Sequence, residues 1–170
     1  MTGPCFVDAN IFVYSQDPRD ARKHARAQAW LDVLWRERLG RTSAQALSEF
    51  YAVATRKLGI DASLAWEEAE RYFSWQPQPV DDALLRRARQ VEQRHRLSWW
   101  DSLIAAAAQL QHCRVLLTED LQDGMRLGEV TVRSPFTYAL EQAAAEYVSE
   151  PVPASRHRGR GRPRRAAPAG

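Results

Sequence analysis

Short apolar runs alternate along this chain with longer segments of helical periodicity. Residues 3–7 and 114–117 read as short buried strands, and residues 130–133 form a further strand-like run. The helical segments are 20–39, 43–58, 62–74, 81–96, 100–111 and 135–148. Strands that alternate with helices predict an α/β fold class with a parallel sheet.

The composition changes near residue 150. A chain of 170 residues most simply forms one folded domain, which we place at residues 1–149. Residues 150–170 are rich in arginine, proline and glycine, so we expect a disordered basic tail. Six of the 24 basic residues lie in 151–170, which leaves 18 basic against 21 acidic residues in the rest. The net charge of +3 is therefore a property of the tail.

Residues 156–165 of this tail carry a nucleic-acid-binding pattern. Within them, Arg160-Gly161-Arg162-Pro163 resembles the core of the AT-hook, a peptide that inserts arginines into the DNA minor groove. We favour the simpler interpretation of nonspecific phosphate contact, because one short match arises easily in an arginine-rich run. Either interpretation predicts salt-sensitive affinity for nucleic acid.

The cysteines, the N-terminus and the apolar runs indicate the cellular compartment. Cys5 and Cys113 each begin a strand-like run, so we expect buried reduced thiols and no disulfide. The N-terminus lacks the basic and apolar regions of a signal peptide. No apolar run approaches the roughly 20 residues that a membrane span needs. We expect a soluble, cytoplasmic protein with no membrane contact.

Four acidic residues, far apart in the chain, occupy recognisable local settings. Asp8 and Asp120 each follow a strand-like run, Asp101 opens a helix, and Glu49 lies within one. Taken singly, each has an ordinary explanation. Asp8 and Asp120 can cap turns, Asp101 completes a capping box with Ser98, and Glu49 can face solvent.

Taken together, the four acids favour a shared site. Ligand sites of parallel α/β sheets form beyond the carboxyl ends of the strands, where Asp8 and Asp120 are expected. Clustered carboxylates repel one another unless protons or cations offset their charge. Oxygen ligands favour Mg²⁺ or Mn²⁺, and metals held by carboxylates support phosphodiester cleavage. Sequence spacing alone does not establish that the four residues meet.

Four segments, in order, carry a family resemblance over roughly residues 3–140. They are Val7-Asp8-Ala9-Asn10-Ile11-Phe12-Val13-Tyr14, the run from Ser43 to Tyr51, the run from Ser98 to Ala107, and Leu117-Thr118-Glu119-Asp120-Leu121-Gln122. In these segments the chain resembles a PIN-domain ribonuclease of the bacterial VapC toxin type. The resemblance implies a three-layer fold, with a short central parallel β-sheet flanked by helices.

The same resemblance implies a site and a set of partners. Asp8, Glu49, Asp101 and Asp120 would bind Mg²⁺ or Mn²⁺, with Asn10 and Thr118 as supporting residues. The chain would be a metal-dependent endoribonuclease and the toxin of a type II toxin–antitoxin pair. It would act on RNA, form a homodimer and bind a cognate antitoxin protein.

Within that expectation the acids take different roles. Asp8 and Asp101 would be direct metal ligands, and Glu49 and Asp120 would hold water or a second ion. We expect Glu119 to be solvated and Asp123 to be a turn residue beside Gly124. Two alternative functions stay open, a structure-specific DNA nuclease and a non-catalytic nucleic-acid-binding protein.

Overall fold

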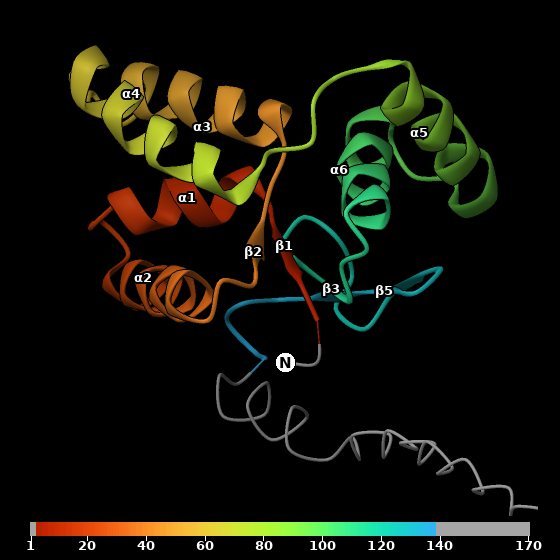
Figure 1. Ribbon diagram of the computed structural model, residues 1–170. Coiled ribbons are helices and arrows are strands. Elements are labelled where there is room, and N and C mark those ends of the chain that lie inside the picture. The colour runs from red at the N-terminus through yellow and green to blue at the C-terminus, as the bar shows by residue number, and fades with distance from the viewer. Residues whose placement is uncertain (1–2, 139–170) are drawn as a thin grey trace, which may run out of the picture.

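A computed structural model describes residues 3–138 of the protein, which fold around a five-stranded sheet (Figure 1). The strands are β1 (Cys5–Val7), β2 (Gly40–Arg41), β3 (Val115–Leu117), β4 (Arg126–Leu127) and β5 (Val130–Arg133). They are ordered β2-β1-β3-β5-β4, with β4 antiparallel to β5 and the other pairs parallel. The predicted α/β class with a parallel sheet is therefore confirmed.

Within residues 3–138, six α-helices and one 3₁₀ helix connect the strands. They are α1 (Ala9–Gln16), α2 (Ala21–Arg36), α3 (Ala44–Arg56), α4 (Ala62–Arg71), η1 (Tyr72–Trp75), α5 (Asp82–His95) and α6 (Trp99–Leu110). All six α-helices of residues 3–138 begin at a polar side chain that accepts a hydrogen bond from a first-turn N–H. These caps are Asp8, Asp20, Ser43, Asp61, Asp81 and Ser98.

The sheet separates two apolar clusters, because successive strand side chains point to opposite faces. Cys5, Val7 and Leu117 pack in one cluster with residues of α1 to α4. Phe6 and Leu116 pack in the other cluster with residues of α5 and α6. Figure 1 shows α1 to α4 on one side of the sheet and α5 and α6 on the other. These are the three layers that the resemblance implied.

Several boundaries differ from the sequence prediction. The helix predicted over 20–39 ends at Arg36, and Gly40 lies in β2. Small size is needed there, because a Cβ on Gly40 would lie 2.5 Å from the Trp75 ring. Residues 134–138 form turns, and the rest of the helix predicted over 135–148 lies outside the described residues, as does the tail. Within the described part of the chain, none of the helices has the length and apolar character to span a bilayer.

Candidate active site

Asp8 lies directly beyond the carboxyl end of β1 and is 7% exposed. Its backbone N–H continues the β1–β3 pairing by donating to the Leu117 carbonyl at 3.1 Å. One carboxylate oxygen, Oδ1, accepts from the Ala9 N–H at 2.7 Å, so Asp8 is also the N-cap of α1. The capping role considered for Asp8 is therefore real. It leaves the second oxygen, Oδ2, directed toward β3.

The Thr118 hydroxyl joins the first aspartate to the last. Val7 and Leu117 are paired across β1 and β3, so the residues that follow them, Asp8 and Thr118, lie next to each other. Thr118 Oγ1 donates to Asp8 Oδ2 at 2.7 Å and accepts from the Asp120 N–H at 3.1 Å. Because Thr118 is fully buried, this hydroxyl is held away from competing water.

Asn10 completes the link from α1. Its side-chain amide Nδ2 donates to Thr118 Oγ1 at 3.1 Å and to Asp120 Oδ2 at 3.0 Å. Its carbonyl oxygen, Oδ1, is buried and has no hydrogen-bond partner among residues 3–138. A buried acceptor without a donor is unfavourable, so this oxygen is suited to a water held in the site.

The carboxylates at this edge act on one another electrostatically. Burial raises the pKa of Asp8 to about 6, against the lowering effect of the hydrogen bonds from Thr118 and Ala9. The negative charges of Asp120 and Glu49 raise the same pKa further. Desolvation, followed by the charge of Asp120, also raises the pKa of Glu49, while Lys57 lowers it. Asp8, Glu49 and Asp120 therefore share one electrostatic environment.

Asp101 makes local contacts at the start of α6. Its backbone N–H donates to Ser98 Oγ at 3.1 Å, and Ser98 Oγ donates back to Asp101 Oδ2 at 2.7 Å. Oδ1 of Asp101 has no hydrogen bond within residues 3–138, so one oxygen stays available. In the described residues, no three His, Cys, Asp or Glu side chains lie close enough to hold one metal ion together. No hydrogen bond among residues 3–138 joins Asp101 to Asp8, Glu49 or Asp120, so the structure does not link it to the other three acids.

Glu119 differs from the sequence expectation, which placed it in solvent. Lys23 Nζ of α2 lies 2.7 Å and 3.0 Å from its two carboxylate oxygens, and the Tyr14 hydroxyl of α1 donates to Oε1. The same ammonium lies 4.4 Å from the centre of the Tyr14 ring and 5.1 Å from that of Phe136. These contacts tie the segment before Asp120 to α1 and α2. The sequence offered no signal for them, because Lys23 lies 96 positions from Glu119.

Asp123 is a turn residue, as predicted. Its Oδ1 accepts from the Ser134 N–H at 2.9 Å, and Gly124 beside it has a left-handed φ of 80°. Its carboxylate lies 4.0 Å from Arg133, the last residue of β5. We therefore leave Asp123 out of the candidate site.

The arrangement fits a hard divalent cation by the chemistry of its donors. Asp8 and Asp120, joined through Thr118 and Asn10, supply carboxylate oxygens, and Asn10 Oδ1 adds a buried acceptor without a partner among residues 3–138. Oxygen-only donor sets of this kind suit Mg²⁺ and Mn²⁺. A cation would also offset the mutual repulsion of the carboxylates.

Comparisons with known proteins agree with this fold. No curated protein matches the chain. The chain shares its fold with the crystal structure of Mycobacterium tuberculosis VapC20, described as a sarcin–ricin loop cleaving toxin. That match has a TM-score of 0.54 and 23% identity, and covers 75% of this chain and 98% of that one. A toxin–antitoxin complex from Klebsiella pneumoniae has a TM-score of 0.53 and 17% identity, covering 77% and 97%.

The family assignment comes from the sequence match. Residues 5–122 match the PIN domain. This range runs from β1 to just beyond β3 and contains all four acids, Asn10 and Thr118. The family match confirms the resemblance that the four sequence segments carry, and the chain belongs to the PIN-domain family.

Proposed function

We propose that this protein is a Mg²⁺- or Mn²⁺-dependent endoribonuclease. The observation that carries the proposal is the link from Asp8 through the Thr118 hydroxyl and the Asn10 amide to Asp120, beyond the carboxyl ends of β1 and β3. Glu49 lies in the same electrostatic environment. Membership of the PIN-domain family supports phosphodiester hydrolysis at this position.

The proposed roles follow from the contacts of each residue. Asp8 and Asp101 would hold the ion directly, Asp8 from a buried position and Asp101 through its available Oδ1. Glu49 and Asp120 would hold water or a second ion. Thr118 and Asn10 are supporting residues, because they orient Asp8 and Asp120 through hydrogen bonds. When bound, the ion would supply a water of lowered pKa and offset charge on the phosphate oxygens.

We further propose that the protein is the toxin of a type II toxin–antitoxin pair. The shared fold with VapC20 and with the Klebsiella pneumoniae complex supports this assignment. A cognate antitoxin, a homodimeric state and a cytoplasmic location belong to the same proposal. Co-expression with the product of an adjacent reading frame, followed by size-exclusion chromatography with light scattering, tests the partner and the stoichiometry.

The activity is tested by incubating the protein with RNA and DNA in Mg²⁺ or in chelator. One RNA should be a sarcin–ricin loop oligonucleotide, because VapC20 is described as cleaving that loop. We expect RNA cleavage in Mg²⁺, and its loss with chelator and in Asp101→Asn. Asp82→Asn is the matched control, because Asp82 is an exposed acid on α5 whose ion pair with Arg86 is long, at 3.7 Å.

Three outcomes of this assay separate the competing functions. RNA cleavage that survives both chelation and Asp101→Asn contradicts the proposed mechanism. Metal-dependent cleavage of branched DNA, with no cleavage of RNA, supports a structure-specific DNA nuclease. Binding of nucleic acid without cleavage under any condition supports a non-catalytic binding protein.

A further inference from the structure

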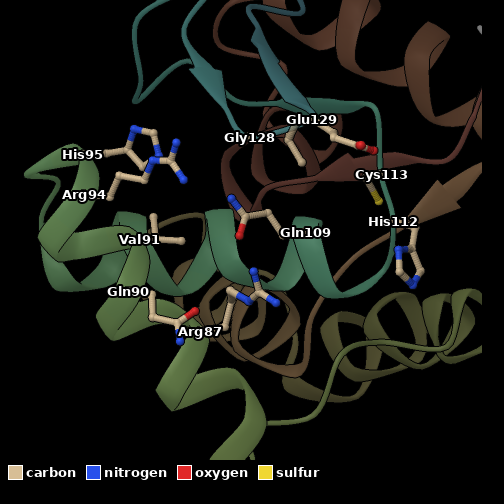
Figure 2. Close-up of a pocket in the computed structure, with 11 residues that line it drawn as sticks. Arg87, Gln90, Val91, Arg94, His95, Gln109, His112, Cys113, Gly128 and Glu129 are labelled. Atoms are coloured by element: carbon tan, nitrogen blue, oxygen red, sulfur yellow. The ribbon is translucent and has the colours of Figure 1, made fainter.

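A polar groove of about 450 Å³ lies between α5, α6 and the turn that joins β4 to β5 (Figure 2). Cys113, which precedes β3, and Val130, which begins β5, line it. The groove therefore opens at the amino ends of these parallel strands. Asp8 and Asp120 lie beyond the carboxyl ends, so the groove is separate from the candidate active site.

The groove carries unpaired positive charge. Arg87 and Arg94 of α5 line it, and neither has a hydrogen bond or an ion pair with any residue in 3–138. Two other arginines of the same helix are paired, Arg86 with Asp82 and Arg89 with Glu92. Neither of these paired arginines lines the groove. The unpaired arginines of α5 are therefore the ones that face this hollow.

The acidic residue of the groove does not offset this charge. Glu129 lies in the turn between β4 and β5 and forms an ion pair of 3.1 Å with Arg114. Figure 2 shows Arg94 and His95 at one end of the groove and the Glu129 carboxylate directed toward Cys113. Among the described residues that line the groove, Glu129 is the one acid. The end of the groove at Arg94 therefore stays positive.

The dipole of α5 explains the position of some of these cations. Cations near a helix C-terminus offset the helix dipole, and Arg94 and His95 occupy the last turn of α5. Arg87 lies two turns earlier, where the dipole is small, so this explanation does not cover it. From Arg87 to Arg94 the helix rises about 10 Å, which is far enough for the two guanidinium groups to contact two separate phosphates of one strand.

We propose that this groove binds phosphate groups of the RNA substrate, as a second contact area outside the active site. The inference rests on the proposed ribonuclease function. Arginine guanidinium groups bind phosphate through paired N–H donors. Gln90 and Gln109, which also line the groove, add amide donors. Contacts of this kind position a nucleic acid without reading its sequence.

The test measures binding of fluorescently labelled RNA by the full-length chain, in chelator, as a function of salt concentration. The groove variant is Arg87→Gln with Arg94→Gln. The control is Arg86→Gln with Arg89→Gln, which removes the same charge from the same helix outside the groove. Circular dichroism melting first confirms that both variants fold.

For the groove variant we expect the slope of log affinity against log salt to fall by about 1.4, because two phosphates are no longer neutralised. We also expect affinity to fall at least about tenfold at low salt. The control should keep the wild-type slope. Equal changes in slope and affinity in the two variants would overturn the proposal.

A small phosphorylated ligand is distinguished by calorimetry with AMP. Saturable AMP binding that the groove variant abolishes, with RNA binding unchanged, overturns the RNA assignment. Cleavage by the wild-type protein is recorded separately. Wild-type protein that binds RNA through the groove but never cleaves it rejects the proposed function and keeps the groove. Wild-type protein that cleaves RNA, combined with equal changes in RNA binding in the groove and control variants, keeps the proposed function and rejects the groove.

Discussion

At the scale of single residues, protonation of the buried Asp8 carboxyl changes the unfolding free energy of the protein. Its pKa in the folded chain is about 6, against 3.8 for an exposed aspartate, mainly because it is buried. Between these two values the folded protein binds more protons than the unfolded chain. Stability that depends on protonated Asp8 is therefore present at low pH and is lost as pH rises through about 6.

We predict that metal-free protein loses about 2 kcal/mol of unfolding free energy between about pH 4.5 and pH 7 through this residue alone. Urea unfolding in chelator across that range measures the loss. Asp8→Asn carries no titrating group, so its pH dependence should be shallower by that amount. A wild-type curve parallel to the Asp8→Asn curve would contradict the assignment. Added Mg²⁺ should stabilise the wild type near neutral pH more than the variant.

Thr118 is the residue through which three groups of the site meet. Thr118→Val keeps the shape but removes the hydroxyl, which leaves Asp8 Oδ2 and the Asp120 N–H without their partner. We expect a loss of about 1–3 kcal/mol in unfolding free energy and slower RNA cleavage. Thr118→Ser keeps the hydroxyl and is the matched control. Equal stability and activity in the two variants would show that the hydroxyl is unimportant.

At the scale of elements, the sequence predicted those strands and helices that show a hydrophobic period. The apolar strands around Cys5 and Val115 were predicted, and so was the position of Asp8 and Asp120 beyond the carboxyl ends of the strands. The two-residue strand β4 was not, because two residues show no periodicity. The partners of Glu119 were also missed, since nothing local in sequence marks a contact between segments so far apart.

These contacts of Glu119 predict a coupling between α2 and the segment that carries Asp120. Lys23 and Glu119 are each about one-quarter exposed, so we expect the pair to contribute about 0.5–1 kcal/mol. A double-mutant cycle with Lys23→Met and Glu119→Gln measures that coupling. The Arg86–Asp82 pair of α5, in which both side chains are at least 80% exposed, is the comparison and should couple more weakly. A coupling of zero for Lys23 and Glu119 would contradict their structural role.

Packing between β2 and η1 gives a second prediction at this scale. Gly40→Ala would place a methyl group 2.5 Å from the rigid Trp75 ring, so backbone or ring must move. We expect a loss of about 1–3 kcal/mol by chemical denaturation. Gly59→Ala is the control, because open space surrounds Gly59 and only its φ of 68° opposes the substitution. A Gly40→Ala protein as stable as wild type would contradict the packing.

At the scale of the whole molecule, the charge is divided between an acidic body and a basic C-terminal segment. Residues 151–170 contain six arginines and no acid, and they lie outside the described residues. The division into a domain over 1–149 and a tail over 150–170 stays a prediction. Deleting residues 151–170 should lower the salt dependence of RNA binding, by about 0.7 in slope for each phosphate that the tail neutralises. An unchanged slope would reject a nucleic-acid role for the tail.

The central claim is that carboxylates from distant parts of the chain hold one divalent cation at the carboxyl edge of the sheet. Titration of the chelator-treated protein with Mn²⁺ by calorimetry tests it without requiring activity. We predict saturable binding that weakens at least about tenfold in Asp8→Asn and in Asp101→Asn, and that Asp82→Asn leaves unchanged. Equal Mn²⁺ affinity in the wild type and in both site variants would contradict the claim.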